Sequence, residues 1–224
     1  MQYQSNDLLL PSGNEPIRIG SSVIVELLGA GGMAKVYKVW NEKLEIYRAI
    51  KILHPSSQED FLKRFETEAK ISAKLNHPNI VDVYNIGEWN DLYYMEMELV
   101  EGTTLETLIT RYGKLPAELV STIAIQIASA LSYAHNQEYL IYGKIYKGII
   151  HRDLKPANIM ISDEGELKLM DFGIASPKNE KLHTQEGVVV GTLQYLSPEQ
   201  LKNAPIDNRT DIYSLGTIIY EILT

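Results

Sequence analysis

Apolar and polar residues alternate along three short runs between positions 17 and 53, which is typical of half-buried strands. The runs are VIVELL, KVYKVW and YRAIKIL, and turns rich in Gly or in Asn, Glu and Lys separate them. From Ser57 to Leu75 the apolar spacing becomes helical, and Asn76-His77-Pro78 ends that helix. The runs NIVDVYNIG and LYYMEMELV then predict two more strands. We therefore expect a small β-rich lobe with one helix.

After Thr104 the pattern is mainly helical. Pro116 opens a long amphipathic helix that ends near His135, and a helix that is apolar on nearly every face runs from about Asn208 to Leu223. Between these helices, NIMIS and ELKLM flank the turn Asp163-Glu164-Gly165 and predict a hairpin. The expected organisation is a polar lead-in over 1–16, a β-rich lobe over 17–98, a hinge over 99–104 and a partial helical lobe over 105–224.

Composition narrows the classes of function. The chain has 224 residues, and 21 basic against 29 acidic side chains give a net charge of −8, which argues against a nucleic-acid binder. Cysteine is absent, so thiolate metal sites, disulfides and Cys nucleophiles are excluded. No apolar run approaches the length of a membrane span, and the first residues lack the pattern of a signal peptide. We expect a cytoplasmic location, and an anchor beyond residue 224 stays open.

A glycine-rich segment, Leu28–Val36, lies between the first two predicted strands. Glycines allow backbone N–H groups to approach an anion without obstruction by side chains. The segment is not a Walker A loop, because no Gly-Lys-Ser/Thr closes it. A phosphate-binding loop and a flexible hairpin turn are both compatible with this stretch.

Strand alternation places Ala49 and Lys51 on one face of the third run and Ile50 and Ile52 on the other. An inward lysine needs an anionic partner. Glu68 falls on the apolar face of the following helix, at helical spacing from its aromatic residues. We expect Lys51 and Glu68 to form an ion pair, either structural or engaged in binding a phosphate.

The strongest chemical signal is His151-Arg152-Asp153-Leu154-Lys155-Pro156-Ala157-Asn158, followed by Asp171-Phe172-Gly173. Asp171 and Asn158 offer the hard oxygen ligands that Mg²⁺ prefers. Asp153 can accept a proton from an alcohol, and Lys155 can neutralise charge on a transferred group. This spaced set predicts phosphoryl transfer to a hydroxyl.

With these motifs, the chain resembles the protein kinase superfamily from about Ile17 to Thr224, and within it the bacterial Ser/Thr protein kinases. The resemblance implies an α+β, bilobal fold with an antiparallel N-lobe sheet, one main N-lobe helix and a mainly helical, incomplete C-lobe. It also implies transfer of the γ-phosphate of ATP, with Mg²⁺ or Mn²⁺, to Ser/Thr hydroxyls of protein substrates.

The same resemblance suggests roles for individual residues. Asp153 would be the catalytic base, Lys155 the phosphate-neutralising lysine, and Asn158 and Asp171 the metal ligands. Lys51, paired with Glu68, would hold phosphates, Met97 would be the gatekeeper, and Glu98 to Val100 would form the hinge to adenine. The nucleotide-binding residues would be Gly29, Ala30, Gly31, Gly32, Val36, Ala49, Lys51, Met97, Glu98, Val100 and Met160.

Residues 171–199 resemble an activation segment, which ends in Ser-Pro-Glu. We expect autophosphorylation of Thr184 to raise activity through pairing with Arg152, with self-association as one route to it. Thr192 would contact the catalytic residues. Asp211 would brace the catalytic loop from the last helix, and the arginine partner of Glu199 would lie in a region that this chain lacks.

Three features depart from the family pattern or leave alternatives open. Ala34 replaces the usual third glycine of the loop, and residues 138–147 look like an inserted hairpin, either a surface excursion or a docking surface. The family's helices after the last one are missing, so we expect residues 1–224 alone to aggregate and to be weakly active. The alternative functions are a pseudokinase or nucleotide-binding interaction module, an inactive fragment, and a kinase for a small molecule.

Overall fold

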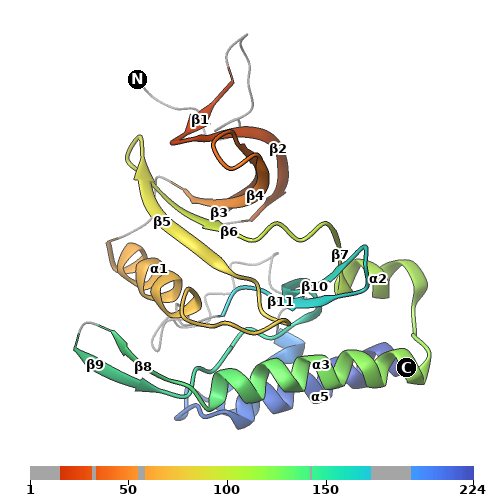
Figure 1. Ribbon diagram of the computed structural model, residues 1–224. Helices are drawn as coiled ribbons and strands as arrows, with labels where there is room; N and C mark the ends of the chain where they lie inside the picture. Colours follow the sequence, from red (N-terminus) through yellow and green to blue (C-terminus); the bar gives the residue numbers. More distant parts are fainter. Residues whose placement is uncertain (1–15, 32–33, 55–58, 142, 173–192) are drawn as a thin grey trace, which may run out of the picture. The chain divides into compact units, whose positions relative to one another are not determined.

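The computed structural model describes residues 16–31, 34–54, 59–141, 143–172 and 193–224. The chain divides into two compact units (Figure 1). The first combines the residues up to Ala69 with Asp82–Leu99, and the second combines Lys70–Val81 with Val100–Thr224.

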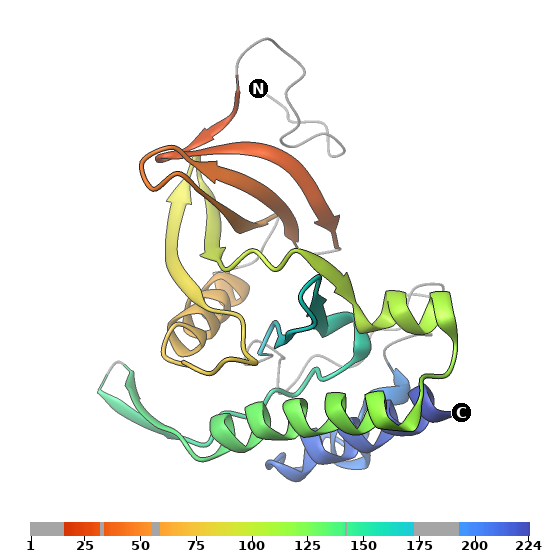
Figure 2. The ribbon, with the colours of Figure 1, turned by 45° about the vertical axis from the view of Figure 1, so that its right-hand side comes forward.

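The first unit is built on an antiparallel sheet in the order β1-β2-β3-β4-β6-β5. Its strands are β1 (Arg18–Ile19), β2 (Ser22–Ala30), β3 (Ala34–Asn41), β4 (Ile46–Leu53), β5 (Val83–Trp89) and β6 (Leu92–Met97). The register of β2 against β3 shifts between Ile24 and Glu26 and again between Leu27 and Gly29. Such irregularities bend a strand, and β2 curves strongly in Figure 2. The three predicted strands before residue 54 and the two after residue 78 are confirmed.

Strand alternation decides which side chains form the core of this sheet. Ile50 and Ile52 are buried in one apolar cluster with Tyr37 and Val39, whereas the intervening Lys51 is only partly buried and lies outside that cluster. The pattern is the one expected for a strand with one face in the core. The expected two faces of this strand are therefore observed.

Helix α1 (Glu59–Ser72) is the one main helix predicted for the β-rich lobe. Phe65 and Ala69 are buried on its inner stripe. The helix stops before the predicted end at Leu75, because the amides of Lys74 and Leu75 donate to carbonyls three residues back, those of Ile71 and Ser72. The chain therefore leaves α1 through tight turns.

The second unit is mainly helical, as predicted. Its helices are α2 (Leu105–Tyr112), α3 (Ala117–His135), α4 (Pro198–Leu201) and α5 (Arg209–Leu223), with 3₁₀ turns η1 (Pro156–Asn158) and η2 (Leu193–Tyr195). Figures 1 and 2 both show α3 and α5 side by side. Ile127 of α3 and Ile218 and Ile222 of α5 are fully buried in one apolar cluster. Ile212 of α5 is 53% exposed, so this helix is not covered on all its apolar positions.

Within the described residues, α3 is also long and apolar enough to be a candidate membrane span by length and composition. One third of that stretch is buried in the structure. The buried residues line one face, which packs in the core of the second unit: Val120, Ile123, Ile127, Ala130, Leu131 and Ala134. This packing is that of a core helix.

A small sheet in the order β11-β10-β7 lies in the second unit, with strands β7 (Gly102–Thr104), β10 (Ile159–Ser162) and β11 (Leu167–Leu169). The predicted hairpin of β10 and β11 is confirmed. Part of the expected hinge is instead a strand, because β7 pairs with β10. Gly102 permits this pairing, since a Cβ atom there would lie 2.1 Å from the carbonyl oxygen of Ile161.

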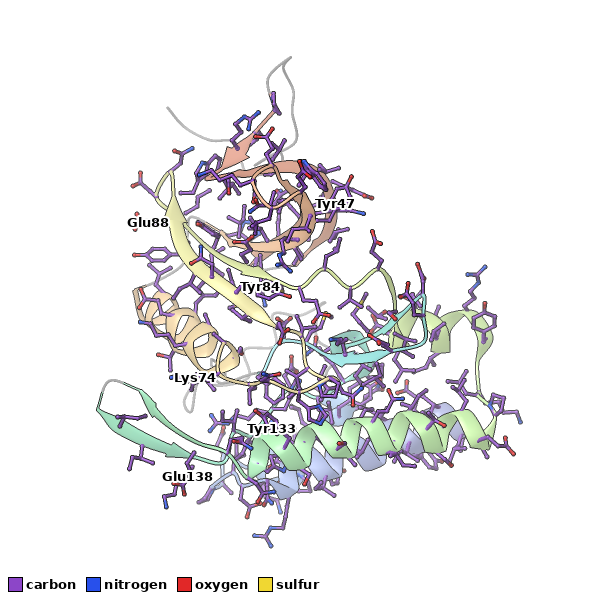
Figure 3. The ribbon with its side chains drawn as sticks, in the orientation of Figure 1. Tyr47, Lys74, Tyr84, Glu88, Tyr133 and Glu138 are labelled. Carbon is purple, nitrogen blue, oxygen red and sulfur yellow. The ribbon has the colours of Figure 1, made fainter. Side chains whose placement is uncertain are left out.

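The predicted inserted hairpin is also observed, as β8 (Glu138–Ile141) and β9 (Lys144–Lys147). Glu138, labelled in Figure 3, forms an exposed ion pair with Lys147 at the base of the hairpin. Next to this pair, the amide of Gly148 donates to the carbonyl of Gln137 at 2.9 Å, and that of Ile149 to the carbonyl of Ala134 at 2.9 Å. The hairpin is thus closed at its base by backbone bonds.

The segment before β5 is attached to α3 by side chains. The hydroxyl of Tyr133, labelled in Figure 3, accepts from the amide of Asn76 at 3.1 Å. The His77 ring accepts at Nδ1 from the amide of Asn79, so its Nε2 donates to Ser129 at 3.2 Å. Burial lowers the pKa of His77 below its ordinary value, because it penalises the charged ring. This contact therefore requires a neutral imidazole.

Candidate active site

Asp153, Lys155 and Asn158 meet in one short loop. Pro156 begins the 3₁₀ turn η1, and the amide of Asn158 donates to the carbonyl of Lys155 at 2.9 Å. This turn brings Asn158 Nδ2 to 3.0 Å from Asp153 Oδ2 and to 2.8 Å from the Asp153 carbonyl. Lys155 Nζ lies 2.9 Å from the same Oδ2. One carboxylate oxygen is therefore held from two sides.

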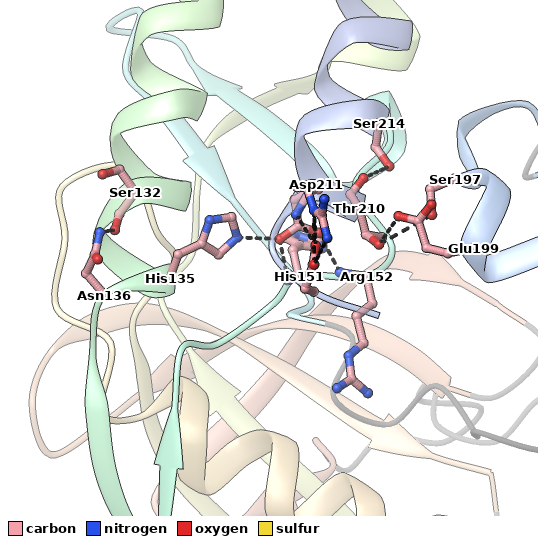
Figure 4. Close-up of polar contacts among 12 residues, drawn as sticks. Ser132, His135, Asn136, His151, Arg152, Ser197, Glu199, Thr210, Asp211 and Ser214 are labelled. Carbon is pink, nitrogen blue, oxygen red and sulfur yellow. Dashed lines mark hydrogen bonds and ion pairs between the residues drawn. The ribbon is translucent and has the colours of Figure 1, made fainter. Parts of the chain in front are cut away.

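Asp211 anchors this loop from α5, as Figure 4 shows. Its carboxylate is fully buried. Oδ1 accepts from the amide of Arg152 at 2.9 Å, and Oδ2 accepts from the amide of His151 at 2.8 Å and from His135 Nε2 at 2.7 Å. The expected bracing of the loop by Asp211 is thus observed, and His135 of α3 adds a third bond.

Arg152 carries the backbone strain of the loop. Its φ is +67°, in the left-handed region that residues with a Cβ atom rarely adopt. Its Nε is buried and has no hydrogen-bond partner among the described residues. Burial lowers the pKa of the Arg152 guanidinium, although the Asp211 carboxylate opposes that effect. The site therefore contains a partly buried cation to which an anion would be attracted.

The loop is joined to the end of β11 through His151. Its buried ring packs on Phe172 with centroids 4.6 Å apart, and its Nε2 donates to the carbonyl of Met170 at 2.9 Å. The amide of Met170 donates in turn to the carbonyl of Asn158 at 3.0 Å. Asp171, which comes next, is exposed and has a positive φ of 53°. The two expected metal ligands thus lie on segments that are hydrogen-bonded to each other.

An amide oxygen and an exposed carboxylate are suitable for Mg²⁺, which keeps waters and phosphate oxygens as its other ligands. Asn158 uses its Nδ2 to hold Asp153, so Oδ1 is the atom with which it would bind a metal. Groups of three or more His, Asp or Glu that could hold an ion do not occur in the described parts of the chain. The donor set therefore fits a metal that is shared with a phosphate ligand.

The segment that leads into α4 is attached to α5. Tyr195 donates to Glu221 Oε2 at 2.6 Å, and both burial and this carboxylate raise the pKa of the tyrosine hydroxyl. Thr210 donates to Glu199 Oε1 at 2.6 Å, a bond that lowers the pKa of that carboxyl. In the described chain, Glu199 is thus bonded to a threonine of α5, a partner that the sequence did not predict.

In the first unit, Gly29 lies opposite Val36, and the amide of Gly31 donates to the carbonyl of Ala34 at 2.9 Å. The described residues of the glycine-rich segment thus lie at the ends of β2 and β3, and its residues 32–33, Gly32 among them, lie outside the described ranges. Val36 also lies opposite Lys51 in the β3–β4 register.

Ala49 is paired with Met97 of β6 and is buried. The next residue, Glu98, donates its amide to the carbonyl of Asp82 at 2.9 Å, which attaches the expected hinge to the start of β5. The chain passes into the second unit at Val100. Met160, the remaining expected nucleotide contact, lies on β10 opposite Thr104.

Other predictions lie outside what the structure describes. Glu68 is on α1, but its side chain is not among the described ones, so its pairing with Lys51 stays a prediction. Thr184, Thr192, Gly32 and the residues 1–15 are also outside the described ranges.

Sequence reasoning missed Gln200, which contacts the catalytic loop at Arg152, and His135, which contacts the loop's anchor Asp211. His135 is 76 residues from Asp211, and no local pattern connects them. For Gln200 a signal existed, because Ser197 and Gln200 have the S-x-x-Q spacing of a capping box, which the structure contains.

The fold and this site define a class of protein. The family model described as "Protein kinase domain" matches residues 22–224. The chain belongs to the protein kinase family, and its expected bilobal α+β fold is confirmed. Members of this family use ATP and a divalent metal ion.

Several proteins similar to this chain are bacterial serine/threonine-protein kinases. The chain is 41% identical over 203 residues to a probable serine/threonine-protein kinase of Clostridium perfringens, covering 90% of this chain and 28% of that protein. It is 40% identical over 207 residues to the serine/threonine-protein kinase PrkC of Bacillus subtilis, covering 92% and 30%. The crystal structure of the Mycobacterium tuberculosis PknI kinase domain matches with a TM-score of 0.70 and 28% identity, over 92% of this chain and 76% of that one. The chain thus spans less than a third of the length of the two curated kinases from Clostridium perfringens and Bacillus subtilis.

Proposed function

We propose that this chain catalyses ATP-dependent phosphorylation of Ser/Thr hydroxyls in protein substrates. The observation that carries the proposal is the Asp153 carboxylate, whose Oδ2 is held by Lys155 at 2.9 Å and by Asn158 at 3.0 Å. The Asp153 side chain is 37% exposed, so a substrate hydroxyl has access to it. A base that is fixed but accessible is what proton transfer from an alcohol requires.

In this proposal Asp153 accepts the proton of the substrate hydroxyl. The oxygen of that hydroxyl forms a bond to the γ-phosphorus at the same time. The bond from that phosphorus to the bridging oxygen of ADP breaks, and ADP leaves. Lys155 neutralises charge on the transferred group, and Asn158 Oδ1 and Asp171 would hold the metal ion, Mg²⁺ or Mn²⁺. When bound, that metal supplies charge neutralisation at the phosphates. Most of the catalytic effect would come from positioning and electrostatics.

The first unit would contribute the remaining contacts to the nucleotide. The glycine-rich segment at the end of β2, Gly29 to Gly32, would bring backbone amides close to the phosphates, and Lys51 would bind the phosphates together with Glu68. Ala49, paired with Met97, offers an apolar surface for the adenine ring. A cytoplasmic location, where ATP is supplied, belongs to the same proposal.

Regulation by phosphorylation is also proposed. The buried Nε of Arg152 has no partner in the described chain, and burial lowers the pKa of the guanidinium, so a nearby phosphate would stabilise it. Phosphorylation of Thr184, by self-association of two copies, would provide that anion. Thr184→Ala is expected to lower turnover, and full turnover of the unphosphorylated variant would refute this route.

The test of the main function is transfer of radiolabelled γ-phosphate to a protein substrate. Asp153→Asn should reduce transfer by about 10²-fold or more, because the amide cannot accept the proton. Asp163→Asn, at an exposed turn, is the matched control and should keep the wild-type rate. Nucleotide binding by calorimetry without any transfer by the wild type would favour an interaction module instead.

A further inference from the structure

The side chain of Gln200 in α4 forms two hydrogen bonds in opposite directions. Its Oε1 accepts from the amide of Ser197 at 3.0 Å, which completes the capping box of α4. Its Nε2 donates to the carbonyl of Arg152 at 2.7 Å. The orientation of the amide is unambiguous, because one neighbour can only donate and the other can only accept.

The Arg152 carbonyl belongs to the peptide group that leads directly into Asp153. Arg152 itself has a φ of +67°, and its amide is held by the buried carboxylate of Asp211. One side of this strained residue is thus fixed from α5, and the other side is fixed by Gln200. Figure 4 shows Arg152 between Asp211 and the segment that carries Ser197 and Glu199.

The capping role and the contact with Arg152 use different atoms of one side chain. A carboxylate at position 200 would keep an oxygen for the Ser197 amide. It would have no N–H for the Arg152 carbonyl, and it would place a negatively charged oxygen against that carbonyl. The two roles can therefore be separated by one nearly isosteric substitution.

We propose that Gln200 is a positioning residue for phosphotransfer, which orients Asp153 through the Arg152–Asp153 peptide. The inference rests on the proposed kinase activity. It predicts that losing the N–H of Gln200 lowers the rate of the chemical step, because a small displacement of a catalytic base has a large effect on rate. Binding of ATP should be unaffected, since the hydrogen bonds of the Gln200 side chain in the described chain go to Ser197 and Arg152, and neither is an expected nucleotide-binding residue.

The experiment compares Gln200→Glu with Gln126→Glu in the purified protein. Gln126 lies on α3 and accepts from Asn79 through Oε1, so the same change there keeps its bond and adds the same charge. We expect kcat of Gln200→Glu to fall by about 10-fold to 100-fold with an unchanged KM for ATP, and that of Gln126→Glu to stay within about 2-fold of the wild type.

Gln200→Met provides a second variant, because it removes both bonds without adding charge. It should lower kcat at least as much, with the KM for ATP again unchanged. Thermal unfolding shows whether each Gln200 variant is folded. If only one of the two is folded, the kcat of that variant decides whether Gln200 has the positioning role. If the wild type is active and both Gln200→Glu and Gln200→Met have the wild-type kcat, the positioning role is overturned and the proposed kinase activity is not. An inactive wild type and an inactive Gln126→Glu would overturn the proposed kinase activity, and the positioning role with it.

Discussion

Asp211→Asn tests how much the buried anchor of the catalytic loop contributes to stability. The wild-type carboxylate accepts three hydrogen bonds, two from backbone amides and one from His135. Asparagine keeps one oxygen acceptor and replaces the other with an N–H group. If the remaining oxygen stays with Arg152, the new N–H faces the amide of His151, and neither can accept.

The magnitude follows from these contacts. A buried donor without a partner costs about 1–3 kcal/mol, and bonds to an ionised acceptor are about twice as strong as neutral ones. We therefore expect the free energy of unfolding to fall by about 3 kcal/mol. For a chain of this size that corresponds to a fall of about 6–12 °C in Tm.

The assay is urea unfolding followed by circular dichroism, with calorimetry for Tm. Asp207→Asn is the control, because Asp207 lies just before α5 begins and forms an exposed ion pair with Arg209, the first residue of that helix. Exposed pairs contribute little, so the control should remain close to the wild type. If Asp211→Asn loses no more stability than Asp207→Asn, the reasoning about the buried anchor is wrong.

Three further substitutions test contacts described above. Tyr195→Phe removes the bond to Glu221 and should lower the free energy of unfolding by about 2 kcal/mol in urea titration; an unchanged midpoint would contradict it. Gly102→Ala should destabilise by about 2 kcal/mol, because its Cβ would meet the carbonyl of Ile161, and retention of the wild-type Tm would refute the clash. For His77, the folded pKa lies below the unfolded value, so its contribution is complete above the unfolded pKa and is lost as pH falls through the folded one. His77→Gln should therefore lose less Tm than the wild type between about pH 8 and about pH 5, and equal losses would disprove this.

The long strands and helices could be predicted because several residues of each repeat the period of the element. The boundaries were less predictable: α1 ends at Ser72, where the following amides donate to carbonyls three residues back. Strand β7 has only three residues, and its identity comes from pairing with β10, far along the sequence. A local pattern has no means of showing such a pairing.

The same distinction applies to the site. Asp153, Lys155 and Asn158 are neighbours in sequence, so their spacing alone placed them together. Gln200 and His135 were missed, since Gln200 reaches Arg152 of the loop, and His135 reaches the anchor Asp211, across a long separation in sequence. Gln200 moreover contacts a backbone carbonyl, which every residue type has, and such a partner leaves no trace in the composition of the loop.

The closed base of the β8–β9 hairpin gives the chain a place where sequence length can change freely. The backbone bonds from Gly148 to Gln137 and from Ile149 to Ala134 join the two ends of the insertion before the catalytic loop begins. Residues can therefore be added to or removed from the hairpin tip without pulling on His151. We therefore expect the hairpin tip to accept new sequence in evolution, or a fluorescent label in the laboratory, with little effect on the catalytic loop.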